Sequence, residues 1–336
     1  MSAPTIMDVA RLAGVSMKTV SRVMNNESAV SEKTRNKVKQ AAFELNYTPN
    51  NAARGLASSK SYLIALIYDI PSPGYAIKIQ KGATNACREY GYHLIVEPLE
   101  SNSPQVEEEI SKLISRLRVD GVILAPPLCD NADVVGLLAQ KNIPYVPIAP
   151  SAVHGTVPIV KMDDVKAAQE ITEHLTSLGH KDIGFVKGHP RHSASALRYE
   201  GFREAMRRAG LRINPDWIVE GDFTYKSGVE AGAKLLSGQN RPTAVFASND
   251  DSAAGVMAIA GRLGLSIPAD LSIAGFDDTA IADSIWPRLT TIRQPVSEMG
   301  YCAAKLLLDT QRDLDVLEHK LNHELIIRES TGHLKQ

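Results

Sequence analysis

The first part of the chain, residues 5–45, carries apolar residues at every third or fourth position, with polar residues between them. This period is typical of helices that bury one face. Gly14 interrupts the pattern, and glycine adopts the left-handed conformation that ends a helix at little cost. We therefore predict three short helices, the first two joined by a tight turn at Gly14. Their predicted inward-facing residues are Ile6, Val9, Ala10, Ala13, Val20, Val23, Val38, Ala41, Ala42 and Leu45.

Residues able to cap helices stand at the predicted starts of these segments. Thr5 followed by Asp8 fits a capping box, and Ser16 and Ser31 can each accept a hydrogen bond from a free amide of the helix that follows. The second helix leaves polar and basic side chains on its outer face, which is typical of a helix-turn-helix unit that enters the DNA major groove. The outward-facing residues are Met17, Lys18, Ser21, Arg22 and Asn25.

From Tyr62 onward, apolar runs alternate with amphipathic stretches, and helices are expected near residues 76–90 and 104–117. This alternation predicts parallel sheets flanked by helices. So many strands fit two doubly wound α/β lobes better than one, with a ligand site in the cleft between the lobes. The predicted strands are YLIALIYD, HLIVEPL, DGVILAPP, PYVPIA, DIGFVKG, DWIVEGDF, TAVFASND, LSIAGFDD and ELIIRES.

A short segment separates the helical head from the α/β part. Its sequence NNAARGLA, residues 50–57, has helical character but is too short to form a stable helix alone. Its order must therefore come from a partner. We place the head at residues 1–48, the linker or hinge helix at 49–60 and the α/β domain at 61–336.

The charge is distributed unevenly along the chain. Residues 1–60 contain nine Lys or Arg and four Asp or Glu, a net charge of +5, whereas the remainder has a net charge of −6. A basic head on an acidic body suits a polyanion bound at one end, although charge alone would also fit an ordinary solvated helical face.

Several function classes lack their usual signals. No apolar run reaches membrane-spanning length and the N-terminus has no hydrophobic signal region, so we expect a cytoplasmic protein without a membrane partner. Cys87, Cys129 and Cys302 are widely spaced, which favours reduced, packed thiols over disulfides or a metal site. No P-loop, HExxH, GxGxxG or GxSxG motif is found, so we expect no enzyme activity and no cofactor.

The strings DVARLAGVS, TVSRVMNN, VSEKTRNKV and LNYTPNNAARGLAS resemble the bacterial repressors of the lactose repressor/galactose repressor (LacI/GalR) type. SIAGFDDTAIADSIWPRLTTIRQP, ASNDDSAAGV and LGHKDIGFVKG are similar to that family's regulatory domain. The resemblance implies a periplasmic-binding-protein-like architecture with crossovers near 158–163, 290–294 and 321–324. The near lobe would comprise about 61–158 and 294–321, and the far lobe about 162–290 and 323–330.

Met17 and Lys18, at the start of the second helix, are the predicted base readers. Lys can donate to guanine O6 and N7, and Met can contact a thymine methyl group. Alternatively, Lys18 contacts a phosphate and Met17 is a surface hydrophobe. The resemblance implies that Ser21, Arg22 and Asn25 also face DNA, whereas the residues better placed for backbone phosphates are Thr5, Ser16, Thr19 and Asn50.

Leu56 lies in a polar linker where no core is expected. The resemblance implies a hinge helix that pairs with its twofold mate in the minor groove and contacts DNA through Ala53, Leu56 and Ala57. Leu56 would then insert into a central base step, a type of wedge that kinks DNA. Local packing of Leu56 against the body is the alternative.

Polar residues at strand ends are the candidate ligand contacts. The resemblance implies that Arg198, Asn249 and Asp277 hold effector oxygens and that Phe223 forms an aromatic wall for a ring. Asn249 and Asp277, like the adjacent Asp250 and Asp278, could equally be helix N-caps. Arg198 could pair structurally with Asp277.

Lesser ligand candidates have equally plain structural alternatives. His192 could be a solvent-exposed loop residue, Tyr75 could simply pack, Asp69 ends the first strand, and Asp163 could cap a helix. Many family members have an acidic residue after the strand that corresponds to PYVPIAP, but this chain has Ala149, Pro150 and Ser151 there. The contribution of the near lobe to recognition is therefore open.

Together these features predict a homodimeric transcriptional repressor that binds a pseudo-palindromic DNA operator and responds to a small-molecule effector, preferably a carbohydrate. The alternatives are a regulator co-repressed by a nucleobase or nucleoside, and a sugar-binding protein without a regulatory role. Only TGHLKQ follows ELIIRES, with no leucine heptad, so a dimer is preferred over a tetramer.

Overall fold

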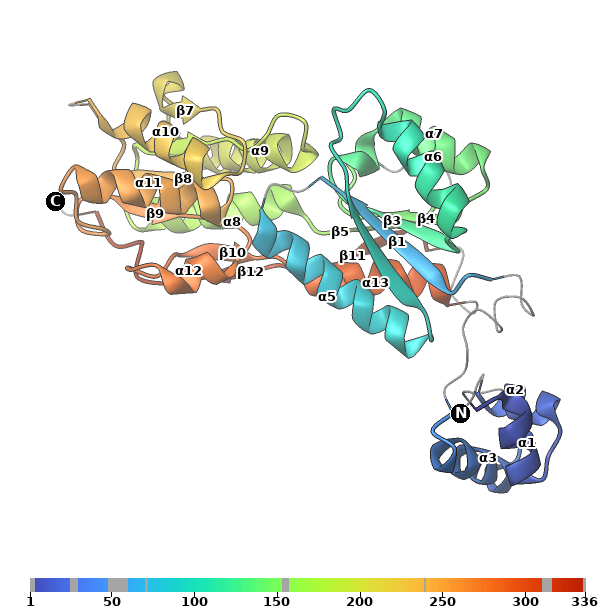
Figure 1. The fold of residues 1–336 in the computed structure, drawn as a ribbon. Helices are drawn as coiled ribbons and strands as arrows, with labels where there is room; N and C mark the ends of the chain where they lie inside the picture. Colours follow the sequence, from blue (N-terminus) through green and yellow to red (C-terminus); the bar gives the residue numbers. More distant parts are fainter. Residues whose placement is uncertain are drawn as a thin grey trace. The chain divides into compact units, whose positions relative to one another are not determined.

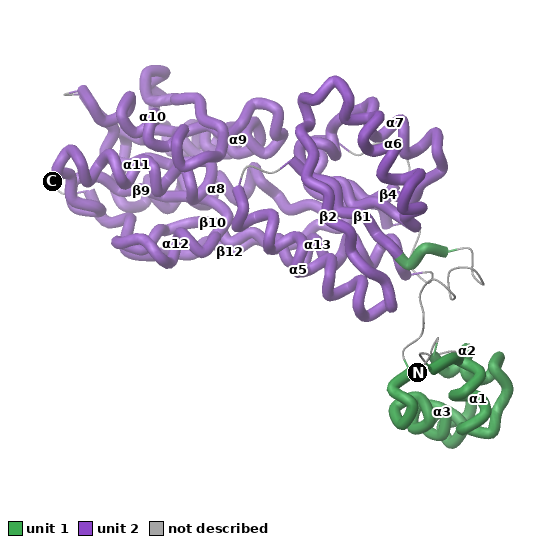
Figure 2. The backbone as a smooth tube through the Cα atoms, viewed as in Figure 1, with its two compact units in different colours: residues 1–62 green, residues 63–336 purple. Residues whose placement is uncertain are grey.

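A computed structural model describes residues 4–24, 30–47, 60–69, 72–152, 157–238, 240–309 and 316–334. The chain forms two compact units, residues 1–62 and 63–336 (Figure 2). The predicted hinge segment 49–60 lies outside the described residues except for Lys60.

The first unit contains α1 (Ile6–Ala13), α2 (Met17–Met24) and α3 (Glu32–Glu44) (Figure 1). The Asp8 carboxylate accepts hydrogen bonds from the Thr5 amide at 2.9 Å and the Thr5 hydroxyl at 2.7 Å, so the predicted capping box is formed. Gly14 has φ of 65° and ends α1, as predicted. The predicted inner faces are confirmed, because the buried core of this unit consists of Val9, Ala10, Val20, Val23, Val38, Ala41 and Ala42.

The near lobe of the second unit is built on a parallel sheet with the strand order β2-β1-β3-β4. Helices α6 and α7 pack on one face of this sheet, and α5 and α13 cover the other (Figure 1). Its elements are β1 (Leu63–Tyr68), α5 (Pro73–Glu89), β2 (His93–Pro98), α6 (Val106–Leu117), β3 (Gly121–Leu124), η1 (Leu128–Asp130), α7 (Ala132–Gln140), β4 (Tyr145–Pro147) and α13 (Val296–Leu308).

Helices α5 and α13 touch through their backbones. A Cβ atom at Gly82 would overlap the carbonyl oxygen of Ser297, and one at Gly300 would overlap the carbonyl oxygen of Ile79. Any larger residue would push the helices apart, so glycine is required at both crossing positions.

The far lobe repeats the design, with the parallel order β7-β6-β8-β9. Phe185, Phe246 and Phe276 pack beneath α8 and α9, while α10 and α11 cover the opposite face. Its elements are α8 (Asp164–Ser177), β6 (Ile183–Val186), α9 (Ser193–Arg208), η2 (Pro215–Trp217), β7 (Ile218–Val219), α10 (Tyr225–Leu236), β8 (Ala244–Ala247), α11 (Asp250–Arg262), β9 (Ser272–Ala274) and α12 (Ala280–Ser284).

Short strands lie where the chain passes between the lobes. In the near lobe, β5 (Ile159–Lys161) pairs with β11 (Glu318–Lys320), and in the far lobe, β10 (Thr291–Arg293) pairs with β12 (Glu324–Ile326). The chain therefore crosses after β5, β10 and β11. The predicted class, a helical head plus an α/β part with two parallel sheets, agrees with this architecture.

Within the described ranges, no helix combines the length and the hydropathy that crossing a lipid bilayer requires.

Candidate functional site

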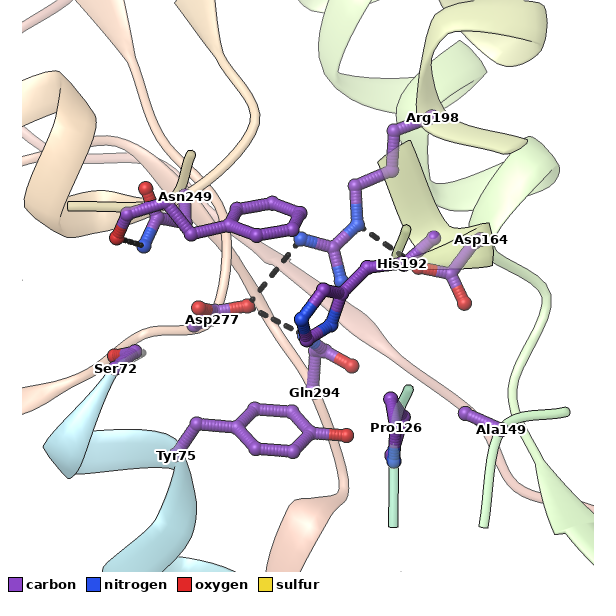
Figure 3. A pocket seen from close by; sticks show the side chains of 12 residues that line it. Ser72, Tyr75, Pro126, Ala149, Asp164, His192, Arg198, Asn249, Asp277 and Gln294 are labelled. Carbon is purple, nitrogen blue, oxygen red and sulfur yellow. Dashed lines mark hydrogen bonds and ion pairs between the residues drawn. The ribbon is translucent and has the colours of Figure 1, made fainter. Parts of the chain in front are cut away.

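A cavity lies between the two lobes of the second unit, where the strands of both sheets end (Figure 3). Near-lobe residues Ser72, Tyr75, Pro126 and Ala149 line one side. The rest of the lining is Asp164, His192, Ala194, Arg198, Phe223, Asn249, Asp277 and Gln294.

Arg198 of α9 is the central polar residue of the cavity (Figure 3). Its Nε donates to Asp164 Oδ1 at 2.9 Å, and its Nη1 donates to the carbonyl oxygen of Ser248 at 2.6 Å and lies 3.6 Å from Asp277 Oδ1. The guanidinium also stacks on the Phe276 ring, with Cζ 3.8 Å from the ring centroid. These contacts fix the guanidinium in one position, so its remaining nitrogen can face a ligand without further ordering.

Asp277 follows β9 and is held by neighbours on several sides. The amide of Gln294 donates to its Oδ1, and its own backbone N–H donates to the carbonyl oxygen of Ile292 at 2.8 Å. Its φ of 110° is a strained value for a residue with a side chain. Burial raises the pKa of Asp277 to about 6, although Arg198 and the Gln294 hydrogen bond act in the opposite direction.

Asn249 and Phe223 are connected by a hydrogen bond. Asn249 Oδ1 caps α11 by accepting from the Ser252 amide at 3.0 Å, and its Nδ2 donates to the carbonyl oxygen of Phe223 at 2.8 Å. The Phe223 ring rests on Gly188, where a Cβ atom would overlap it. Asn249 thus caps a helix and also lines the cavity, so both predicted roles are structurally compatible.

Two ionisable residues in the cavity wall are neutral near pH 7. Burial, reinforced by the neighbouring His189, lowers the pKa of His192 to about 4. Burial also raises the pKa of Tyr75 above its ordinary value. The His192 ring packs edge-on to Phe223, with ring centroids 5.5 Å apart. Each side chain can therefore serve as a neutral hydrogen-bonding group near pH 7.

Asp69 and Asp163, also predicted as ligand residues, do not line this cavity. Asp69 accepts from the amide of Ser101 at 2.9 Å and from its hydroxyl at 2.7 Å. Asp163 caps α8 through the Lys166 amide at 2.9 Å and pairs with Lys320 at 2.7 Å. Asp163 therefore caps a helix, which was the structural alternative to its predicted ligand role.

Sequence reasoning missed Ser72, Asp164 and Gln294 among the polar lining residues. Asp164 directly follows Asp163, and no feature of the sequence shows which of the two adjacent carboxylates faces the cavity. Gln294 follows β10, a short strand that was not predicted. The end of that strand would have indicated Gln294 as a candidate.

Two polar contacts join the lobes beside the cavity. Ser72, the N-cap residue of α5, donates its hydroxyl to Asp251 Oδ2 of α11 at 2.7 Å. Lys78 of α5 donates to the backbone carbonyl oxygens of Asp277 and Asp278. The conformation described here is therefore held together by direct bonds between the lobes.

In the first unit, the predicted DNA-contacting residues lie around α2. Thr5, Ser16, Met17, Lys18 and Arg22 are exposed, while Thr19 and Ser21 are half-buried. Ser16 accepts a hydrogen bond from the Thr19 amide at 3.2 Å and so caps α2. Asn25, Asn50, Ala53, Leu56 and Ala57 lie outside the described residues.

Comparisons with known proteins agree with this division. Residues 5–50 match the model of bacterial regulatory proteins of the lacI family, and residues 172–331 match that of a periplasmic binding protein-like domain. The chain is 36% identical over 335 residues to the HTH-type transcriptional regulator DegA of Bacillus subtilis (strain 168), covering 98% of each chain.

Two solved structures are similar over nearly the whole length. A Lac repressor dimer bound to operator and the anti-inducer ONPF has a TM-score of 0.80 and 30% identity, covering 98% of this chain and 100% of that chain. A complex of the transcriptional regulator CelR with cellobiose has a TM-score of 0.73 and 30% identity, covering 97% of this chain and 99% of that chain. The predicted combination of a helix-turn-helix head and a periplasmic-binding-protein-like body is thereby confirmed.

Proposed function

Because the chain belongs to the lacI family of bacterial regulatory proteins, we propose that it is a transcriptional repressor whose operator affinity is changed by a carbohydrate bound in the interlobe cavity. The observation that carries this proposal is the cavity wall, in which a fixed arginine, two carboxylates and two amides line the same cavity as the Phe223 ring. Such groups complement the hydroxyl groups and the apolar face of a sugar ring. The similar CelR structure was solved with cellobiose.

The head supports the DNA-binding part of the proposal. Residues 1–60 have a net charge of +5 in a chain whose net charge is −1, and Met17 and Lys18 are exposed at the start of α2. We propose that these two residues read bases and that Thr5, Ser16 and Thr19 contact phosphates. A homodimer would place two heads on a pseudo-palindromic operator, as in the Lac repressor dimer bound to operator.

The relatives are transcriptional regulators and not enzymes. We accordingly propose that this chain has no catalytic activity, needs no cofactor and acts in the cytoplasm. Its three working parts are the head at 1–48, the linker at 49–60 and the ligand-binding body at 61–336.

We propose that the ligand acts on DNA binding through the linker. A sugar that contacts both lobes would change the relative positions of the two near lobes in a dimer, and with them the positions of the two linkers. A segment too short to be helical alone needs that support in order to fold. To reverse a 1:99 equilibrium fully, ligand binding must favour one state by about 5.5 kcal/mol, which two coupled sites can share.

The ligand part of the proposal is tested with the full-length protein. A thermal-shift screen against neutral sugars, sugar acids, sugar phosphates and nucleobases should give selective stabilisation by a carbohydrate. Anisotropy titrations against duplexes selected from a random pool, with and without the hit, should then show changed affinity. Stabilisation by nucleobases alone would contradict the carbohydrate assignment.

The wedge role of Leu56 is tested separately. Leu56→Ala should weaken operator binding and leave ligand binding and thermal stability intact. Leu263→Ala, at an exposed leucine of the far lobe, is the matched control. Equal operator affinity of both variants at fixed salt would remove Leu56 from the mechanism.

A further inference from the structure

The charges in the cavity wall are not balanced. Arg198 is the cation of the lining, only 5% exposed, and it faces the carboxylates of both Asp164 and Asp277. The near-lobe side adds Ser72, Tyr75, Pro126 and Ala149, and none of these brings a positive charge. One guanidinium is thus shared between two carboxylates before any ligand enters.

Charges just outside the lining do not restore the balance. Lys78 points its ammonium group at the backbone carbonyl oxygens of Asp277 and Asp278. Asp251 adds a carboxylate next to Ser72, whereas burial raises the pKa of Asp250, whose carboxyl is bonded to Thr279 and Thr291, so that Asp250 adds no negative charge near pH 7. Lys78 and Asp251 therefore contribute one charge of each sign and leave the imbalance of the lining unchanged.

Both lining carboxylates keep an acceptor available for a ligand. Asp164 uses Oδ1 for Arg198, and Asp277 uses Oδ1 for Gln294 and Arg198. Among the described residues, none donates a hydrogen bond to the second oxygen of either carboxylate. Hydroxyl groups of a ligand can donate to these oxygens, and hydrogen bonds to an ionised acceptor are the stronger kind.

We propose that Asp164 and Asp277 make this cavity selective for uncharged polyols, and that Asp164 is the specificity-determining residue that excludes phosphorylated and carboxylated sugars. This inference rests on the carbohydrate function proposed above and specifies its ligand class. The near lobe brings only a methyl group to the cavity at Ala149, and the second carboxylate of the lining comes from the start of α8 in the far lobe.

The physical basis is the cost of a third negative charge in a buried site. A phosphate or carboxylate group would compete with Asp164 and Asp277 for the same guanidinium, and the group that lost would be left buried and unpaired. A neutral hydroxyl group requires no counter-ion and can donate to one carboxylate while accepting from Arg198. Exclusion of anions thus requires no steric block.

The test on the unmodified full-length protein uses matched ligand pairs that share a ring. Calorimetric titrations compare glucose with glucuronate and glucose 6-phosphate, galactose with galacturonate, and ribose with ribose 5-phosphate. In each set that binds, the neutral member should have a Kd at least 100-fold lower. Tighter binding of an anionic member overturns this inference but leaves the carbohydrate function standing, whereas no binding by any sugar overturns both.

A pair of adjacent carboxylates provides a matched variant test. Asp164→Asn removes one lining charge while its amide oxygen can still accept from Arg198, and the neutral-to-anionic affinity ratio should fall at least tenfold. Asp163→Asn, whose carboxylate lies outside the cavity, should keep the original ratio. An unchanged ratio in Asp164→Asn would overturn the role of Asp164. If that variant does not fold, the ligand pairs on the unmodified protein still decide the charge selectivity.

Discussion

The two lobes contribute different chemistry to the cavity they share. The far lobe supplies the buried charged groups Asp164, Arg198 and Asp277, together with His192, Phe223 and Asn249, whereas the near lobe supplies a hydroxyl, a phenol and apolar atoms. A ligand can therefore form most of its polar bonds on the far lobe alone. In the proposed binding mode, the near lobe would cover the ligand mainly by shape and by its direct bonds to the far lobe. The proposal therefore assigns recognition and closure to different halves of the fold.

The largest effect should come from removing the charged centre of the far-lobe wall. Arg198→Ala leaves two carboxylates buried without their cation, which should cost about 3–5 kcal/mol of unfolding free energy. Urea unfolding followed by circular dichroism measures this cost. Arg203→Ala, on the exposed side of the same helix, should cost less than about 1 kcal/mol. Similar losses of unfolding free energy in both variants would mean that the buried ion pairs of Arg198 do not stabilise this wall.

Ligand affinity should divide between the lobes in the same way. Asp277→Asn replaces a charged acceptor in the far lobe and should weaken ligand binding by about 1.5–3 kcal/mol, or roughly 10- to 150-fold. Tyr75→Phe removes a near-lobe hydroxyl and should cost about 1 kcal/mol or less. Calorimetry with the ligand found in the screen compares the two variants. A larger loss for Tyr75→Phe would reverse the assignment of recognition to the far lobe.

Acid should act on the far-lobe wall through His192. Its pKa is about 4 in the fold against 6.5 as the ordinary value, so below pH 6.5 the unfolded chain binds more protons and the unfolding free energy falls. At pH 5.5 the loss due to this group should be about 1.4 kcal/mol relative to pH 7.5. Asp277, whose pKa is raised, acts in the opposite direction.

The effect of His192 is isolated by comparing pH series of unfolding free energies. His192→Gln should be less sensitive to acid than the unmodified chain by about this amount. Tyr75→Phe, a near-lobe variant, should follow the unmodified chain. Parallel curves for the unmodified chain and His192→Gln would show that the imidazole is not held neutral by the fold.

The smallest effect should come from the bond that joins the lobes. Ser72→Ala removes the hydrogen bond to Asp251 and should shift the balance from closed to open lobes by about 1 kcal/mol, or roughly fivefold. Small-angle scattering of the ligand-free protein and ligand affinity report this shift. Ser101→Ala removes a Ser–Asp bond of the same 2.7 Å length within the near lobe and should leave the balance unchanged. Equal scattering curves for the two variants would exclude a closing role for Ser72.

Strong local signals made the head and the two sheets predictable. The apolar spacing in residues 5–45 corresponds to the observed core, and Thr5 with Asp8 forms the predicted capping box. The other predicted apolar runs became parallel strands, because burial on both faces leaves a sequence signal that requires no knowledge of partners, whereas ELIIRES became β12, which pairs antiparallel with β10. The family resemblance and the fold class were confirmed by the comparisons.

Strands β5, β10 and β11 at the crossings were not predicted, whereas β12 lies within the predicted strand ELIIRES; part of the cavity was also missed. Strand β11 is only three residues long, Glu318–Lys320, with polar residues at both ends, and its pairing with β5 is a contact distant in sequence. Asp163 and Asp164 are adjacent residues of the same type. Only the geometry at the start of α8 determines that Asp164 lines the cavity and Asp163 does not. The roles of the predicted DNA and ligand residues stay predictions until binding is measured.

The crossing of α5 and α13 limits how the near lobe can move. At Gly82 and Gly300 the helices meet backbone to backbone, so sliding one helix along the other would drive side chains of adjacent turns into main-chain atoms. Shear is therefore blocked at this joint, and rotation of the whole lobe about the three crossing segments is the motion that stays available. The N-terminus of α5 lies next to the cavity. Because α5 and α13 would move as one rigid body, a displacement of that N-terminus would also displace the C-terminal end of α5.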